Sequence, residues 1–214
     1  MDYPRFPYWM VGKLLFRFTL QFATLSVRIS GKCSFSKRIY DGIAADDSPV
    51  NGGSYVAESN DAFEKNNFHC YEDGYCYGFI ETKYRSGHTG ENAYANAITI
   101  ESINPMCKGQ PSVDGVRVVL VAFSPTLKKT VIVGWYDNAT VYRNRVVHGN
   151  LIYMTKCLCS DAHLIPDKER SFEIPRGQGN EFGIGQSNFW YIQTKPNTHD
   201  FEQKITEYID SSDY

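Results

Sequence analysis

Short runs in which hydrophobic and polar residues alternate recur along most of the chain, and this period of two is typical of half-buried β-strands. The run Val116–Ala122 is almost continuously apolar, as expected for a strand that is covered on both faces. Asp73-Gly74 lies between two of the runs and predicts a hairpin turn. The predicted strands are 68–71, 75–81, 94–103, 116–122, 130–136, 139–143 and 150–159.

A helical period appears near the C-terminus, in the segment His199–Ile209. Its hydrophobic residues fall on one side of a helix and are Phe201, Ile205, Tyr208 and Ile209. Thr198 precedes the segment and can cap its first turn. Many short strands and one late helix predict a mainly β fold of the α+β class, a small curved β-barrel with a C-terminal helix.

Two parts can be distinguished along the chain, although no repeat or Pro/Ser-rich linker separates them. Residues 1–40 form an N-terminal segment that fits no clear class, in which Val11–Ser30 suits one or two strands. Residues 41–214 form the predicted β-barrel-like recognition domain, and its first part, as far as Asn67, is rich in turn-forming residues.

Charge and aromatic content narrow the kind of partner. The formal net charge is −2, so no global basic field draws the chain onto nucleic acid, and any such contact must come from a local patch. Aromatic residues make up 14% of the chain, with 15 Tyr and 13 Phe, which favours strands and flat recognition surfaces over a helical bundle.

The cysteines and the N-terminal apolar run bear on location. The run Leu14–Val27 is interrupted by Arg17 and Gln21, so it is too short and too polar to span a membrane and is a poor secretion signal. We therefore expect a cytoplasmic protein with reduced thiols and no membrane contact. Cys157 and Cys159 share one face of a predicted strand and are expected to be buried thiols.

The cysteine spacings do not match those of a structural zinc site, and no glycine-rich phosphate loop is present. We therefore expect no metal and no cofactor.

Two stretches, 133–143 and 174–191, combine aromatic, amide and guanidinium groups, the mixture that a reader of an unstacked base requires. The predicted base-binding residues are Trp135, Tyr136, Asn138, Ser187, Asn188, Trp190 and Tyr191. The predicted phosphate contacts are Arg143, Arg145 and Arg176. The alternative is that the tryptophans are core residues, which is the commoner fate of strand-borne Trp.

Several motifs resemble the N-terminal, non-catalytic domain of bacterial HNH-type and other restriction-like endonucleases, in consistent order over about residues 50–210. They are Asn51–Val56, Tyr77-Gly78, Val113–Val116, Gly134–Tyr136 continuing through Asn138–Arg143, Pro166–Arg170 and Gly185–Tyr191. The resemblance implies a targeting domain that finds DNA for a nuclease, which would then be a separate subunit. By a weaker analogy the domain is similar to the pseudouridine-synthase-and-archaeosine-transglycosylase (PUA-like) barrels, whose relatives flip out modified bases.

Two other functions stay open. Asp73 followed by Glu81 and Lys83 has the order of a Mg²⁺-dependent nuclease core of the Asp…Glu-x-Lys type, in which carboxylates hold the metal and the lysine polarises water. Alternatively, the aromatic residues form a surface for a protein partner. Because no complete catalytic constellation is present, we expect a recognition module rather than a self-sufficient enzyme.

Overall fold

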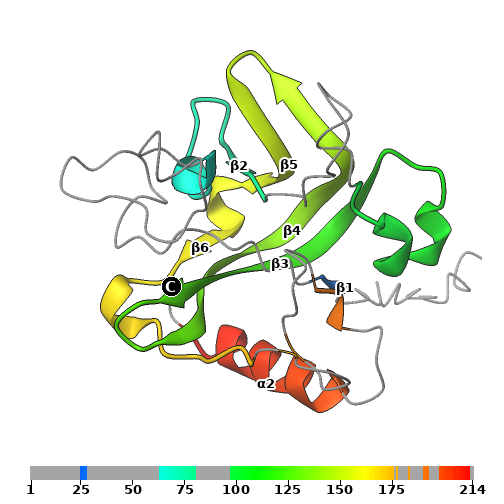
Figure 1. Ribbon diagram of the computed structural model, residues 1–214. Helices are drawn as coiled ribbons and strands as arrows, with labels where there is room; N and C mark the ends of the chain where they lie inside the picture. The colour runs from blue at the N-terminus through cyan, green and yellow to red at the C-terminus, as the bar shows by residue number, and fades with distance from the viewer. Residues whose placement is uncertain are drawn as a thin grey trace, which may run out of the picture.

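The computed structural model describes residues 25–27, 63–80, 97–175, 177, 183, 190–192 and 198–212. In this part of the chain six strands form one sheet in the order β1-β3-β4-β5-β2, with β6 paired to β4 (Figure 1). The strands are β1 Leu25–Val27, β2 Tyr75–Gly78, β3 Ser112–Ser124, β4 Lys129–His148, β5 Leu151–Leu158 and β6 Ala162–Leu164. The helices are α2 His199–Asp210 and the 3-10 helices η2 Phe63–Asn66, η4 Ile100–Ser102, η5 Pro105–Cys107, η6 Cys159–Asp161 and η7 Asp167–Glu169. The prediction of a mainly β, curled sheet with a C-terminal helix is confirmed.

Strand β4 organises the sheet because it is 20 residues long and pairs with three others. One edge pairs with β3, and the other pairs first with β6 and then with β5, always antiparallel. The predicted break at Asp137-Asn138 is a local irregularity within this one strand, where Asn138 has a left-handed backbone with φ 49°. Such irregularities increase the twist and curl the sheet.

The N-terminal segment contributes to the same sheet. Its strand β1 runs parallel to β3, with Leu25 opposite Val116 and Val27 opposite Val118. This strand falls within the stretch Val11–Ser30 that was expected to supply strands, and the rest of that stretch lies outside the described residues.

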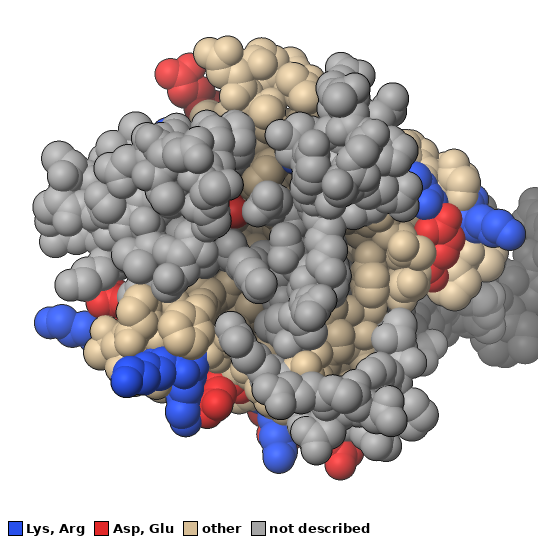
Figure 2. Space-filling model, in the orientation of Figure 1, with Lys and Arg blue, Asp and Glu red and all other residues tan. Residues whose placement is uncertain are grey.

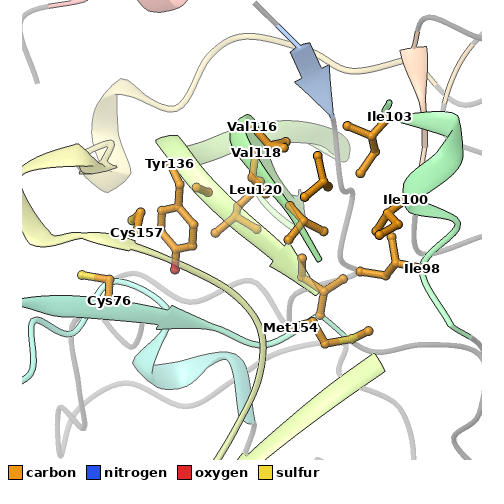
Figure 3. Close-up of a cluster of buried hydrophobic side chains, with 14 of the residues drawn as sticks. Cys76, Ile98, Ile100, Ile103, Val116, Val118, Leu120, Tyr136, Met154 and Cys157 are labelled. Atoms are coloured by element: carbon orange, nitrogen blue, oxygen red, sulfur yellow. The ribbon is translucent and has the colours of Figure 1, made fainter. Parts of the chain in front are cut away.

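The core lies on both sides of β3, which confirms the burial expected of Val116–Ala122. Val118 and Leu120 point into a first cluster, seen in Figure 3, whereas Val119 and Val121 point into a second cluster. Helix α2 covers the second cluster with Ile205 and Ile209. Thr198 is the N-cap residue of α2, as expected, but its side chain makes no capping hydrogen bond, because its hydroxyl donates to the carbonyl of Ile192.

Two predicted strands differ from the structure. The described part of 94–103 is a loop followed by η4, although its isoleucines, Ile98, Ile100 and Ile103, are buried as expected. Directly after this segment the Asn104 side chain accepts a hydrogen bond from the N–H of Met106 and caps η5, which begins at Pro105. At Asp73-Gly74 the turn is present, but strand structure is found only after it, in β2.

A disulfide bond joins Cys70 to Cys159 across 89 positions of sequence. The expectation of reduced thiols is therefore wrong for this pair. Cys157 is buried as expected, but Cys159 begins η6, is half-buried against the same cluster and is not a thiol, because it is bonded to Cys70. None of the described helices is long and apolar enough to cross a membrane.

Candidate recognition surface

The two aromatic rings expected to wall a base pocket on β4 lie inside the protein. Trp135 is 2% exposed and belongs to the second cluster, with its ring stacked on His163 at 5.1 Å between centroids. Tyr136 is fully buried, and Figure 3 shows it among side chains from β3 and β5; its hydroxyl donates to the carbonyl of Asn67. Neither ring therefore offers an open face to a base in this structure.

The aromatic residues of the second stretch also serve packing. Trp190 is half-buried against the second cluster, 6.0 Å from the ring of Phe201. Tyr191 packs against the first cluster, and its hydroxyl accepts a hydrogen bond from the backbone N–H of Thr99 at 2.9 Å. Burial raises the pKa of Tyr191. The structure thus places the two tryptophans at the same cluster, but as core and border of the core rather than as walls of a hollow.

The polar candidates are dispersed. Asn138 is exposed on β4, whereas Arg176, Ser187 and Asn188 lie outside the described residues. The guanidinium carbon of Arg145 lies 5.2 Å above the centre of the Phe79 ring.

Arg143 is engaged within the protein. Its two terminal nitrogens donate to the carboxylate of Glu101 at 2.6 and 3.0 Å, and its Nε donates to the carbonyl of Gln110 at 2.9 Å. The hydrogen bonds from Arg143 lower the pKa of Glu101 from 4.5 to about 2. A fork of this kind fixes η4 to β4 and leaves Arg143 poorly placed to hold a phosphate.

Titration of Glu101 provides a test of this pairing. A carboxyl group with a lowered folded-state pKa stabilises the fold above its ordinary value and loses that effect as the pH falls toward about 2. In an Arg143→Gln variant we expect the midpoint for Glu101, followed by NMR of the labelled carboxyl carbon, to rise toward 4.5. An unchanged midpoint would show that another group holds the carboxylate.

The alternative nuclease triad is represented by Asp73 alone, because Glu81 and Lys83 lie outside the described residues. The Asp73 carboxylate accepts hydrogen bonds from the Tyr77 hydroxyl and from the N–H of Tyr75, and the bond from Tyr77 lowers its pKa. No three His, Cys, Asp or Glu residues in the described part of the chain are grouped so that they could hold a metal ion.

A connected set of tyrosines, which no sequence pattern had assigned to one site, lies across β2, β5 and β4. We call it the tyrosine band, and its members are Tyr71, Tyr75, Tyr77, Tyr142 and Tyr153. Tyr77 is central, with ring centroids 5.5 Å from Tyr71, 6.4 Å from Tyr75 and 4.7 Å from Tyr153. Tyr153 in turn lies 5.6 Å from Tyr142. All except Tyr153 are partly exposed, so the band presents ring surface to solvent.

Basic residues accompany the tyrosine band. Lys156 places its ammonium group 4.8 Å above the centre of the Tyr75 ring. We call the hairpin formed by residues 139–158 the basic arm, because it contains no Asp or Glu and its cationic residues are Arg143, Arg145 and Lys156. Helix α2, at the opposite end of the view in Figure 1, carries four acidic residues and one lysine.

The charge is therefore local rather than global. On the face seen in Figure 2, the described Lys and Arg side chains lie apart and are mixed with acidic ones, so this face has no broad basic patch among the described residues. Among the described residues, positive charge and exposed aromatic surface occur together where Lys156 of the basic arm lies beside the tyrosine band.

Comparisons with protein-family models, curated proteins and solved structures found no match to this chain.

Proposed function

We propose that this chain is a DNA-recognition module that holds unstacked bases on the tyrosine band and phosphates beside the basic arm. The observation that carries the proposal is the contact of three tyrosines in and before β2 with Tyr142 and Tyr153 of the basic arm, a hairpin without acidic residues; the three are Tyr71, Tyr75 and Tyr77. Aromatic rings stack on any base, and cations beside them hold the backbone, so the two together bind single-stranded nucleic acid.

The residues proposed for base stacking and for phosphate binding differ from those that the sequence predicted. Tyr75 and Tyr77 replace Trp135 and Tyr136 as the stacking surface, since the latter pair is buried. Lys156 joins Arg145 as a phosphate contact. Asn138 is exposed and remains a polar reader in this proposal, together with Ser187 and Asn188, while Arg176 remains a phosphate contact.

The motif resemblance supports the same class of function. It makes this chain a targeting domain of restriction-like type with a PUA-like barrel, a modified or flipped base as its ligand and a separate nuclease subunit as its partner. The curled sheet is compatible with that assignment.

The test is fluorescence anisotropy with labelled single-stranded and duplex oligonucleotides, plain and base-modified, at several salt concentrations. We expect Tyr75→Ala to weaken binding about 5- to 150-fold and Tyr75→Phe to retain it, because stacking on an aromatic ring contributes about 1–3 kcal/mol per base. Lys156→Gln should reduce the salt slope by about 1. Lys129→Gln is the matched control, because Lys129 is exposed, paired with Glu173 and outside the basic arm.

Two results would overturn the proposal: no binding to any of these oligonucleotides at low salt, or equal binding by Tyr75→Ala and the wild type. A protein-interaction surface is the second candidate, favoured by the same band because tyrosine is enriched in protein interfaces. Capture of a protein partner that added DNA does not displace, and that Tyr75→Ala abolishes, would favour it.

A further inference from the structure

The Cys70–Cys159 disulfide lies at one end of the tyrosine band. Cys70 is exposed and directly precedes Tyr71, while Cys159 follows the last residue of β5. The bond therefore ties the turn that carries Tyr71 to the base of the basic arm. A single backbone hydrogen bond runs alongside it, from the N–H of Cys159 to the carbonyl of Gly74 at 3.0 Å.

The other attachments of the turn lie near the surface. The exposed Asp73 accepts hydrogen bonds from the Tyr77 hydroxyl and the N–H of Tyr75, and the ring of Tyr71 lies 4.6 Å from that of His69. The N–H of Tyr71 donates to the carbonyl of Tyr75 at 3.0 Å, which joins the turn to the first residue of β2, and the N–H of Gly74 donates to the carbonyl of Tyr71 at 2.9 Å, within the turn. The side chain of Tyr71 contacts half-buried neighbours, the Tyr77 ring at 5.5 Å and Asn66 through a side-chain hydrogen bond. Segments with exposed hydrogen bonds and few buried contacts open at low free energy unless something holds them.

Two further thiols lie nearby but do not compete for the bond. Cys76 and Cys157 face each other across β2 and β5 and are 1% and 2% exposed. Burial raises the pKa of Cys157, and because the thiolate is the attacking species, this thiol is a poor partner for exchange. Reduction must therefore come from an external thiol, for which the exposed Cys70 is the accessible sulfur.

We propose that the Cys70–Cys159 disulfide is a redox switch for the tyrosine band. An external dithiol attacks the exposed bond, the S–S bond between Cys70 and Cys159 breaks, and two S–H groups form while the dithiol is oxidised to its own disulfide. After reduction the turn 71–74 keeps only non-covalent attachments near the surface, which are its ring contacts, its backbone hydrogen bonds and the bonds to the Asp73 carboxylate. We expect Tyr71 then to leave the band. The expected effect of reduction on DNA binding rests on the proposed function. The expected loosening of the turn 71–74 does not depend on that function.

Hydrogen exchange read by mass spectrometry tests the structural part, on the full chain with and without dithiothreitol. We expect peptides covering residues 69–75 to exchange about tenfold faster after reduction, while peptides from the centre of β4 do not change. The reduced wild type requires no substitution, so the test does not depend on a variant that folds. Cys70→Ser should behave as the reduced protein in either buffer, and Cys107→Ser is the control for loss of a thiol elsewhere. Equal exchange in both states, or an intact mass without the disulfide after oxidative purification, would overturn the switch.

The anisotropy assay tests its consequence. We expect reduction to weaken oligonucleotide binding by the wild type about fivefold, within the range for loss of one stacked ring, and to leave Cys70→Ser unaffected by dithiothreitol. Unchanged binding despite faster exchange would overturn the switch as a control of recognition. Absence of binding in both states would instead remove the proposed function, with the exchange result still deciding whether the disulfide holds the turn.

Discussion

Trp135→Ala is expected to lower the free energy of unfolding by about 3–5 kcal/mol, the cost of removing a large buried aromatic side chain. Trp135 is 2% exposed and fills the second cluster between the sheet and α2. One face of its ring rests on His163, so truncation leaves a cavity that backbone hydrogen bonds on both strands prevent from closing.

Urea unfolding followed by circular dichroism measures this loss as a lower midpoint with an unchanged slope. Trp190→Ala is the matched control, because the same side chain is only half-buried there and should cost less. A stable Trp135→Ala variant that has lost binding to DNA would return Trp135 to the role of a stacking wall and contradict its burial.

Gly134→Ala is expected to lower the stability by about 3 kcal/mol, the upper part of the range for overpacking. A Cβ atom at this position would lie closer than 3.0 Å to the carbonyl oxygen of His163 and to the ring of Phe68. The ring can rotate away, but the carbonyl belongs to β6, which is paired with β4 at Gly134, Trp135 and Tyr136. Strand β6 would have to separate from β4 to make room.

Comparison of the thermal unfolding of Gly134→Ala and Gly149→Ala separates the loss of stability caused by steric overlap from the loss caused by backbone strain. Gly149 has φ 57°, and a Cβ atom added there would meet no other atom within 4 Å, so its replacement tests backbone strain alone, at a cost of about 1 kcal/mol. Addition of Phe68→Ala should not restore Gly134→Ala, because the carbonyl contact persists. Equal losses at the two glycines would show that β6 accommodates the methyl group.

The elements that the sequence predicted best are those whose buried faces show in the pattern of neighbouring residues. The apolar run of β3 and the helical spacing of α2 are properties of neighbouring residues, and both were confirmed. The segment Val131–Tyr136 is equally apolar and is buried throughout, so its tryptophan had no face left for a ligand. That inference was available from the sequence, because a strand without alternation is covered on both sides.

The candidate site was less accessible to prediction because its parts are distant along the chain. Tyr75 and Tyr77 share the spacing of one strand face, which was a visible signal. Their approach to Tyr153 depends on the register of β2 against β5, and that register joins positions such as Gly78 and Thr155, which are 77 residues apart. Likewise, six cysteines allow many pairings, and only the folded chain brings Cys70 to Cys159.

Strand β4 is joined to β3 and to β5 by short connections, and this determines which parts of the sheet can form first during folding. Strands β3, β4 and β5 follow one another in sequence and form two hairpins, so their contacts require only short loops to close. Strand β2 must instead be brought from far upstream onto the free edge of β5. During synthesis the hairpins can therefore form before β2 docks, and since Cys70 travels with β2, the covalent link closes only on a sheet that is already built.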